Sequence, residues 1–206
     1  MYGYAYRQYH SLKRQVRIIE DIGAKYYEEY LAGDDDAVEK LIETYYPGLT
    51  LYIKGVTGDY DMAEDIAQDT FVKLVTKQPR FSGKSSFKTW LYSIAGNIAK
   101  DYLKAERRRK TQSLDDAKDQ PALDDIELTI IQNEQYSQLY KGLLQLKPEY
   151  RQALWLTYFE GLTIKEVAKI MKRSEGSVSA LISRGKFALS PHITENRDNN
   201  GKGEKN

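Results

Sequence analysis

The chain has 206 residues, of which 41% are hydrophobic and 30% are charged, a composition typical of one folded domain or two small ones. It contains no cysteine, which excludes disulfide bonds, zinc sites with cysteine ligands and thiol catalysis. No apolar run approaches the roughly 20 residues that a membrane helix needs, and the N-terminus lacks the apolar core of a signal peptide. We therefore expect a cytoplasmic protein that is not inserted in a membrane.

Charges of each sign are concentrated in separate segments, although the net charge is only +1. Residues 59–69 carry five acids and no base, and residues 115–127 carry six acids and one lysine. Residues 100–110 and residues 165–186 each carry six bases and two acids. This segregation favours separate surfaces for partners of opposite charge. Helix faces that contact only solvent would give the same pattern.

Almost every long segment predicts a helix, because its apolar residues recur with a period near 3.6. Residues 1–25, which begin "MYGYAYRQYH", are expected to form a flexible N-terminal extension. Asp36 and Glu39 have the spacing of a capping box at a helix start, and Pro47 is a point where this helix can kink. The apolar stripe of this helix consists of Val38, Leu41, Ile42, Tyr45, Leu49, Tyr52 and Ile53.

A second helix is predicted after the turn "TGDYD". Its buried face consists of Ala63, Ile66, Ala67, Thr70, Phe71 and Leu74. On a helical wheel, its outward face consists of Asp61, Glu64, Asp65, Gln68 and Val72. This outward face is acidic and has a single apolar residue.

The loop "KQPRFSGKSS" precedes a third helix, predicted from Phe87 to Lys110. Its buried stripe is expected to be Leu91, Ile94, Ala95, Ile98, Tyr102 and Ala105. Trp90 lies about 100° away from the centre of that stripe on the wheel, among polar residues. The residues that share its face are Ser93, Asn97, Lys100, Asp101 and Lys104.

This face of the third helix suits a single strand of nucleic acid. Unpaired bases stack on aromatic rings, cations follow the phosphates, and amides and hydroxyls hydrogen-bond exposed base edges. The alternative is that Trp90 packs against the helix at 63–74. The basic residues would then be there because the dipole of a helix C-terminus favours positive charge.

Beyond the third helix, residues 111–129 are acidic and contain Pro121, and they predict a flexible linker. One further helix is expected to follow a cap at Asn133. Another is expected to start with Pro148 at its first position and to end at Gly161. Residues 191–206 predict a disordered tail. The expected fold is all-α, with two small helical domains at 26–110 and 130–190.

The segment "GLTIKEVAKIMKRSEGSVSALISRGKFAL" predicts a helix-turn-helix. Thr163 and Glu166 form a capping box, a break follows at Lys172 and Arg173, and Ser174 caps the second helix. The first helix is expected to bury Ile164, Val167, Ala168 and Met171, and the second Val178, Leu181, Ile182, Gly185 and Leu189. The outward residues are Arg173, Gly176, Ala180, Ser183 and Arg184, flanked by Ser177 and Ser179. Small polar residues and arginine on that face suit the DNA major groove, although a plain helical hairpin would show a similar pattern.

Four segments in this order carry a family resemblance: "GDDDAVEKLIETYYPGL", "TGDYDMAEDIAQDTFVKL", "FSGKSSFKTWLYSIAGNIAKDYLKAERRR" and "LLQLKPEYRQALWLTYFEGLTIKEVAKIMKRSEGSVSALISRGKFAL". Together they resemble bacterial sigma factors of the sigma-70 family, specifically the small extracytoplasmic-function type. The resemblance covers about residues 31 to 190.

The resemblance implies a function in transcription initiation. The first domain corresponds to region 2 of the family, and its acidic face at Asp61, Glu64, Asp65, Gln68 and Val72 would dock on the beta-prime coiled coil of core RNA polymerase. The second domain corresponds to region 4, which reads the −35 element and contacts the beta flap. The acidic linker would run through the polymerase towards its active-site channel. An anti-sigma factor, often anchored in the membrane, is a further expected partner.

The resemblance also implies two sets of promoter contacts. The residues expected to hold a melted −10 strand are Lys84, Ser85, Ser86, Phe87, Lys88, Trp90, Ser93, Asn97, Lys100, Asp101, Lys104, Arg107 and Arg108. The residues expected at the −35 duplex are Arg173, Ser174, Gly176, Ser177, Ser179, Ala180, Ser183 and Arg184. No catalytic residue, cofactor, metal or small-molecule substrate is expected.

The sequence departs from the family pattern at two places. Family recognition helices often carry Lys or Arg just after the position of Val178, where this chain has Ser179, Ala180 and Leu181. Residues 1–25 extend beyond the usual start of the family, and their bases and tyrosines suit either a DNA contact or a flexible tail.

Two other classes of protein compete with this interpretation. A helix-turn-helix regulator that binds duplex DNA without polymerase would explain residues 161–189, but it assigns no role to the acidic helix or to the face of Trp90. An enzyme is disfavoured, because both histidines, His10 and His192, lie in predicted tails and no phosphate-binding glycine loop or nucleophile–base pair is present. The acids of residues 59–69 are spaced for a docking face rather than for a metal site.

Overall fold

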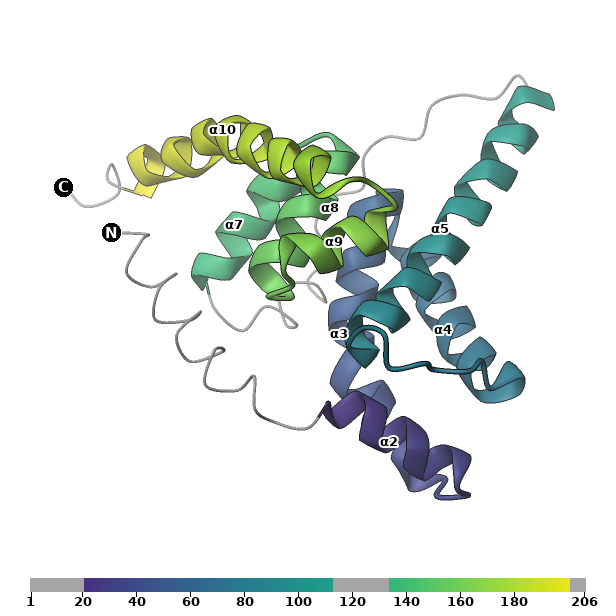
Figure 1. Ribbon diagram of the computed structural model, residues 1–206. Coiled ribbons are helices and arrows are strands. Elements are labelled where there is room, and N and C mark those ends of the chain that lie inside the picture. Colours follow the sequence, from purple (N-terminus) through teal and green to yellow (C-terminus); the bar gives the residue numbers. More distant parts are fainter. Residues whose placement is uncertain (1–20, 113–133, 201–206) are drawn as a thin grey trace.

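A computed structural model describes residues 21–112 and 134–200 of the chain, and all the regular secondary structure in these ranges is helical (Figure 1). The first half, residues 21–112, contains α2 (Ile22–Leu31), α3 (Asp36–Thr57), α4 (Tyr60–Lys77) and α5 (Phe87–Gln112). The second half, residues 134–200, contains α7 (Glu134–Leu144), α8 (Pro148–Leu154), the π-helical turn η2 (Trp155–Phe159), α9 (Ile164–Met171) and α10 (Glu175–Asn200). None of the described helices is long and apolar enough to span a membrane.

The helix boundaries correct two expectations at the chain ends. Helix α2 starts at Ile22, with the Asp21 carboxylate accepting a hydrogen bond from the amide of Ala24, so the expected domain start at residue 26 falls inside a helix. Helix α10 continues through Pro191 to Asn200, although a tail was expected from residue 191. A proline removes one backbone hydrogen bond, which a long helix can lose without ending. The rest of the expected extension, most of the linker and residues 201–206 lie outside the described residues.

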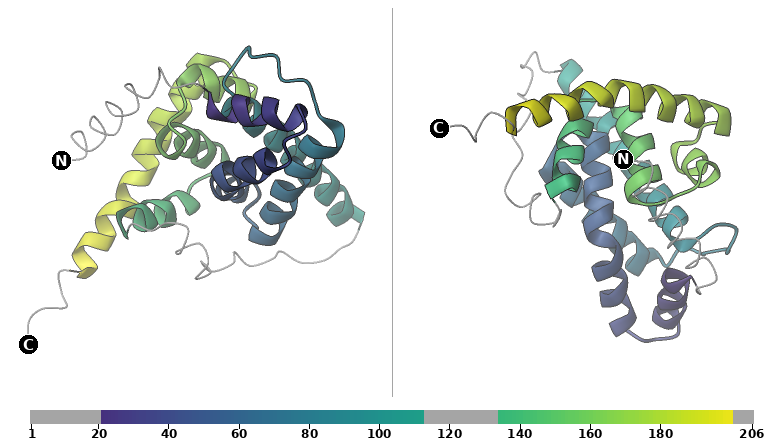
Figure 2. Two further views of the ribbon diagram at one scale, coloured as in Figure 1. Left: turned by 90° about the horizontal axis from the view of Figure 1, so that it is seen from below. Right: turned by 90° about the vertical axis from the view of Figure 1, so that its left-hand side faces the viewer.

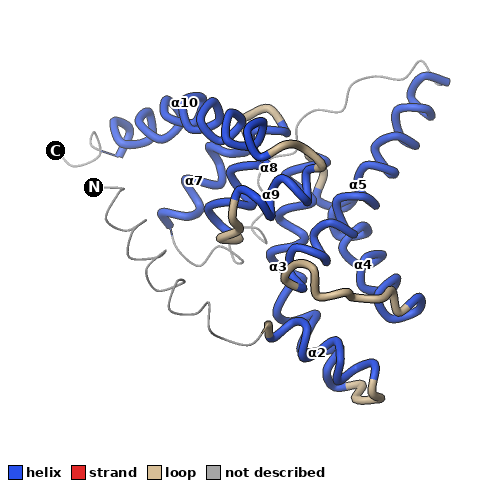
Figure 3. Tube along the Cα trace, in the orientation of Figure 1, coloured by secondary structure: helices blue, strands red, loops and turns tan. Residues whose placement is uncertain are grey.

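The first half is built on the predicted apolar faces. Helix α4 buries Ala63, Ile66, Ala67, Thr70, Phe71 and Leu74, which confirms the predicted face. Of the stripe predicted for α3, Leu41, Tyr45, Leu49, Tyr52 and Ile53 are buried, whereas Ile42 is exposed. Short loops join these helices, and the loop at 78–86 between α4 and α5 is the longest one among the described residues (Figure 3).

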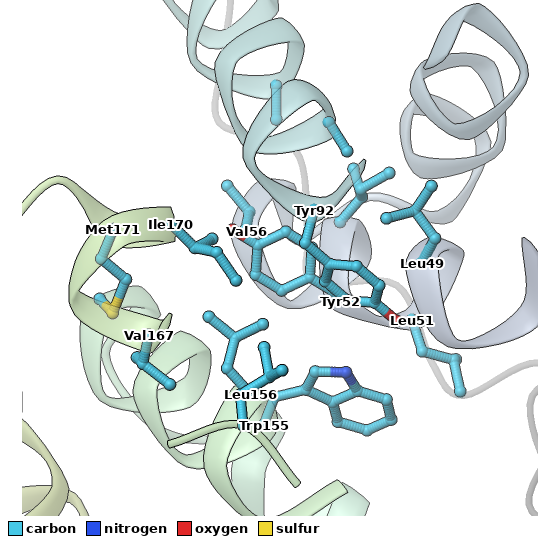
Figure 4. Packing of buried hydrophobic residues seen from close by; sticks show 14 of the residues in the cluster. Leu49, Leu51, Tyr52, Val56, Tyr92, Trp155, Leu156, Val167, Ile170 and Met171 are labelled. Carbon is cyan, nitrogen blue, oxygen red and sulfur yellow. The ribbon is translucent and has the colours of Figure 1, made fainter. Parts of the chain in front are cut away.

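The structure brings the two predicted helical domains into contact along α3 and α5. Helix α8 packs on α3, and α9 packs on α5. Figure 4 shows Leu156 and Trp155 of η2, with Val167 and Ile170 of α9, facing Tyr52, Val56 and Tyr92 of the first half. All residues from Leu49 to Val56 are consequently buried on every side of α3. In Figure 1 and in the right-hand view of Figure 2, α2 lies at the bottom of the molecule and α10 at the top.

Helix α5 leaves the body of the protein in its second part (Figure 1). Its early residues Leu91, Tyr92, Ala95 and Ala99 are buried. Tyr102 and Ala105, expected to continue the buried stripe, are exposed, because they lie in the part of α5 that extends beyond the body of the described residues. The Tyr102 hydroxyl donates to the Asp69 carboxylate of α4 at 2.6 Å, and this hydrogen bond raises the Tyr102 pKa.

Trp90 packs in a cluster of aromatic rings at the start of α5. Its ring centroid lies 5.5 Å from Tyr27, 5.2 Å from Phe81 and 5.4 Å from Phe87. The Tyr27 hydroxyl donates to the carbonyl of Pro79 at 2.9 Å, which ties the loop to α2. Trp90 is therefore half-buried, neither on the apolar stripe nor free in solvent, and its neighbours come from α2 and the loop rather than from α4.

We expect Trp90→Ala to lower the free energy of unfolding by about 2–3 kcal/mol, less than the roughly 3–5 kcal/mol of a fully buried tryptophan. The loss comes from contacts with three rings, and it is limited because the side chain is only half-buried. Urea unfolding followed by circular dichroism measures this value. The control Val72→Ala, at an exposed apolar residue of α4, should change stability by less than about 0.5 kcal/mol. A Trp90→Ala loss as small as the control's would mean that the cluster does not contribute to stability.

Candidate nucleic-acid and polymerase interfaces

The loop at 78–86 presents polar groups at the start of α5. Gly83 has φ +67°, a left-handed conformation that glycine adopts without strain. Ser86 caps the helix, since its hydroxyl accepts from the amide of Thr89 at 3.2 Å. The Asp21 carboxylate accepts from the amide of Phe87 at 2.6 Å. Lys84 is exposed in this loop, and Ser85 and Ser86 are half-buried.

Phe87 does not belong to the surface expected to hold a nucleic-acid strand. Its side chain is fully buried and packs against the rings of Tyr27, Tyr45 and Phe81. A helix buries its first residue where two other elements cross it, here α2 and α3. Phe87 therefore positions Trp90 and is itself unavailable to a base.

The remaining residues expected to hold the −10 strand lie along α5. Lys88, Trp90, Ser93 and Asn97 are half-buried, and Lys100, Asp101, Lys104, Arg107 and Arg108 are exposed. The Ser93 hydroxyl donates to the carbonyl of Thr89 at 2.7 Å, so its proton is already used within the helix. The face is therefore rigid and aromatic at its start and cationic towards its end.

A groove of about 350 Å³ lies in the cationic part of this face. It is lined by Lys100, Leu103, Lys104, Arg107 and Arg108. The pKa of Lys100 is lowered, first because the ammonium is partly buried and then because the cations of Lys172 and Arg173 lie near it. The turn of the helix-turn-helix and α5 thus contribute to one positively charged surface, which suits phosphate groups.

The predicted outward face of α4 is available to a partner. Asp61, Asp65, Gln68 and Val72 are exposed, and Glu64 is half-buried. The side chain of Val72 is 56% exposed, a high fraction for an apolar residue, and it shares this face with acidic side chains. Residues 21–112 and 134–200 contain no group of three or more His, Asp or Glu side chains that could hold a metal ion. The chemistry of this face fits a basic protein surface that also offers an apolar contact.

The helix-turn-helix forms as predicted. The Thr163 amide donates to the Glu166 carboxylate at 2.8 Å, and the Glu166 amide donates to the Thr163 hydroxyl at 3.4 Å, which together make the capping box. Lys172 adopts φ +55° in the turn, and the Ser174 hydroxyl accepts from the Ser177 amide at 3.2 Å. The predicted stripe Val178, Leu181, Ile182, Gly185 and Leu189 is buried.

Helix α9 differs from its prediction at two apolar residues. Ile164, expected in the core, is 39% exposed, whereas Ile170, not assigned to the core, is 2% exposed. Ile170 faces the first half of the molecule (Figure 4). The apolar residues of α9 therefore serve two contacts, one with α10 and one with α5, and a single helical stripe could not describe both.

The outward face of α10 and the turn is largely exposed. Exposed side chains are Arg173, Ser174, Ser179, Ser183 and Arg184, and Gly176 is exposed as well, whereas Ser177 and Ala180 are half-buried. Arg173 pairs with Glu149 of α8 at 3.0 Å. Phe187 of α10, which the sequence analysis did not assign, is 84% exposed. An exposed phenylalanine on the same helix is an apolar contact available to another protein.

Comparisons with known proteins identify the family of the chain. Residues 41–109 match the Sigma-70 region 2 family, and residues 136–189 match the Sigma-70 region 4 family. The RNA polymerase sigma-H factor of Pseudomonas aeruginosa is 34% identical over 76% of this chain and 86% of its own length. The ECF RNA polymerase sigma factor SigX of Bacillus subtilis is 30% identical over 77% of this chain and 84% of its own length.

A solved structure has the same fold. The sigma factor RpoE from Bartonella quintana, in complex with the anti-sigma factor NepR, superposes with a TM-score of 0.64 at 23% identity, over 76% of this chain and 96% of that one. From the matched regions and the relatives together, the chain belongs to the sigma-70 family of RNA polymerase sigma factors, in its extracytoplasmic-function group.

Proposed function

We propose that this protein binds core RNA polymerase, directs it to specific promoters and helps to melt the −10 element. The observation that carries the proposal is the presence of three exposed faces of different chemistry on one chain. They are the acidic face of α4, the aromatic and cationic face of α5, and the outward face of the helix-turn-helix. A regulator that binds duplex DNA without polymerase needs only the last of these.

At the −10 element, α5 would capture unpaired bases instead of catalysing a reaction. Unstacking a base costs a few kcal/mol, and a stack on an aromatic ring returns about 1–3 kcal/mol. The Trp90 ring packs against the rings of Tyr27, Phe81 and Phe87, so its orientation is fixed before a base arrives. The groove at Lys100, Lys104 and Arg107 would then guide the phosphates that follow.

At the −35 element, α10 would enter the major groove. Arg184 is exposed and is the basic residue of the predicted outward face within α10 itself. Ser179 and Ala180 occupy positions where sigma factors of this type often carry Lys or Arg. This helix can therefore make fewer ionic contacts with the DNA backbone. Arg173 already pairs with Glu149, which fixes its position near the turn.

The proposed contacts with other proteins are also divided between the two halves. The acidic face of α4 would dock on the beta-prime coiled coil, and the second half, with exposed Phe187, would contact the beta flap. An anti-sigma factor would compete for these faces; the Bartonella quintana sigma factor RpoE was solved in complex with the anti-sigma factor NepR. We further propose that the protein acts in the cytoplasm, where such a factor can hold it at the membrane.

The double variant Asp65→Lys, Gln68→Arg tests the polymerase contact. Both side chains are exposed, so the fold should be unchanged and binding to core polymerase should be lost on a sizing column. The matched control Glu43→Lys, Thr44→Arg makes the same change in charge at exposed residues of α3 and should co-migrate with polymerase like the wild type. Equal binding by both double variants would exclude the α4 face and would favour a polymerase-independent regulator.

Arg184→Ala tests the duplex contact. If Arg184 reads a base edge, affinity for a −35 duplex should fall by about 1–3 kcal/mol and the preference at one position should relax. The control Lys186→Ala removes the same charge from α10, but that ammonium lies over the ring of Tyr158 at 5.1 Å. Titrations against specific and scrambled duplexes measure both quantities. An equal loss for both duplexes would mean that Arg184 contacts only phosphate.

A further inference from the structure

Helix α2 is fixed to the start of α5 by Asp21 and Gly23. The Asp21 carboxylate accepts from the Ala24 amide at 3.3 Å and from the Phe87 amide at 2.6 Å, through a different oxygen each time. It therefore satisfies one free amide in the first turn of each helix. At Gly23, α2 approaches its neighbours closely, because a Cβ built there would lie 2.5 Å from Phe87 Cδ1 and from the Tyr45 hydroxyl. A glycine allows this approach, and a side chain would force the helices apart.

Tyr27 joins α2 to the loop at 78–86. Its hydroxyl donates to the carbonyl of Pro79 at 2.9 Å, and its ring centroid lies 5.5 Å from that of Trp90. Phe81 follows Pro79 by two residues and packs on Trp90 from the loop, with 5.2 Å between the ring centroids. The loop has no regular secondary structure of its own at these residues. The hydrogen bond to Pro79 therefore limits where Phe81, and with it the Trp90 ring, can lie.

A second tyrosine of α2 contacts the end of α4. The Tyr30 hydroxyl donates to the carbonyl of Val75 at 3.2 Å and accepts from the side-chain amide of Gln78 at 3.4 Å. Gln78 is the C-cap of α4 and has φ +42°. Tyr30 thus acts where the loop begins, before the part of the loop that packs on Trp90.

The contacts of α2 fix the aromatic part of the α5 face before any strand binds. Ordering a side chain during binding costs free energy comparable with the gain from one stack on an aromatic ring. A Trp90 ring that is already held avoids this cost. All of α2 precedes residue 41, where the match with the Sigma-70 region 2 family begins. The residues that hold the ring from this side are therefore additional to the matched region.

We propose that α2 is a positioning element for the −10 strand, in which Asp21 and Tyr27 hold the loop and the Trp90 ring and so set how strongly α5 captures an unpaired base. Neither side chain needs to touch the DNA for this role. The inference rests on the proposed function, because the position of the ring matters to the strand only if Trp90 stacks on a base.

Fluorescence of Trp90 tests the positioning without DNA. The chain has two tryptophans, so Trp90 is the only one in a Trp155→Phe background. Tyr27→Phe removes the hydroxyl that holds Pro79 and keeps the ring. Its matched control, Tyr30→Phe, also removes one hydrogen bond from a tyrosine of α2 to a carbonyl. Time-resolved anisotropy should show faster local motion of Trp90 in Tyr27→Phe than in Tyr30→Phe, and equal motion would overturn the proposal.

Strand capture is measured with the same variants in holoenzyme assembled with core polymerase. Tyr27→Phe should bind a single-stranded −10 oligonucleotide about fivefold more weakly than the wild type, the effect of one net hydrogen bond. Tyr30→Phe should keep the wild-type affinity, and neither variant should lose affinity for a −35 duplex. Equal losses in the two variants, or a loss shared by the duplex, would mean that Tyr27 supports the fold in general and would overturn its positioning role.

A wedge at Gly23 tests the same proposal through the backbone. The methyl group of Gly23→Ala would lie 2.5 Å from Phe87 Cδ1, so α2 must move away from α5. The matched control Gly55→Ala, in α3, places its methyl group 3.5 Å from Arg151, an ordinary contact distance. We expect Gly23→Ala, and not Gly55→Ala, to increase the motion of Trp90 and to weaken binding of the oligonucleotide. Wild-type behaviour of Gly23→Ala in either measurement would contradict the proposal.

Trp90→Ala in the holoenzyme separates this inference from the proposed function. If that variant binds the oligonucleotide like the wild type, Trp90 is not the ring that holds a base, and the proposed role of α5 fails together with the link from α2 to the strand. The anisotropy would still show whether α2 holds the ring. A loss in Trp90→Ala, with wild-type motion and affinity in Tyr27→Phe, would leave the proposed function intact and would overturn the positioning role alone.

Discussion

The burial of α3 on every side from Leu49 to Val56 is the constraint on which the rest of the structure depends. A helix packs on one face against its own bundle, and α4 and α5 supply that contact in the first half. The opposite face is also apolar, because Leu51 and Val56 lie off the stripe that the first half uses. Only the second half can cover that face, through α8 and η2, and this sets where the helix-turn-helix lies.

Much of this architecture could be predicted from the sequence, because its signals are local. The buried face of α4, the capping box of Thr163 and Glu166 and the inner stripe of α10 depend on residues within a few turns of each other. The contact between the halves was missed, since it joins residues about 80 positions apart, such as Ser86 and Glu166. Its local traces were residues outside the assigned stripes, such as Leu51 and Val56 in α3, Tyr92 in α5 and Ile170 in α9.

The position of Trp90 shows the same limit at the candidate site. A helical wheel correctly placed Trp90 outside the buried stripe of α5. A wheel describes a single helix, however, and not the elements that pack against it. The rings that surround it come from α2, which was not predicted, and from the loop, through Phe81. Phe87 was misassigned to the surface for the same reason, because α2 and α3 cover the first turn of α5.

These contacts make α5 the element that joins the two halves and carries the proposed strand-holding residues. Its first turn packs on α2, α3 and α9, and its last turns carry a cationic groove beyond the body of the protein. In its first turn and just before it, Lys88 and Ser86 contact Glu160 and Glu166 of the second half. Lys100, Lys104 and Arg108 of the groove are exposed and lie further along the helix. Their positive charge suits an initial electrostatic contact with the phosphates of DNA.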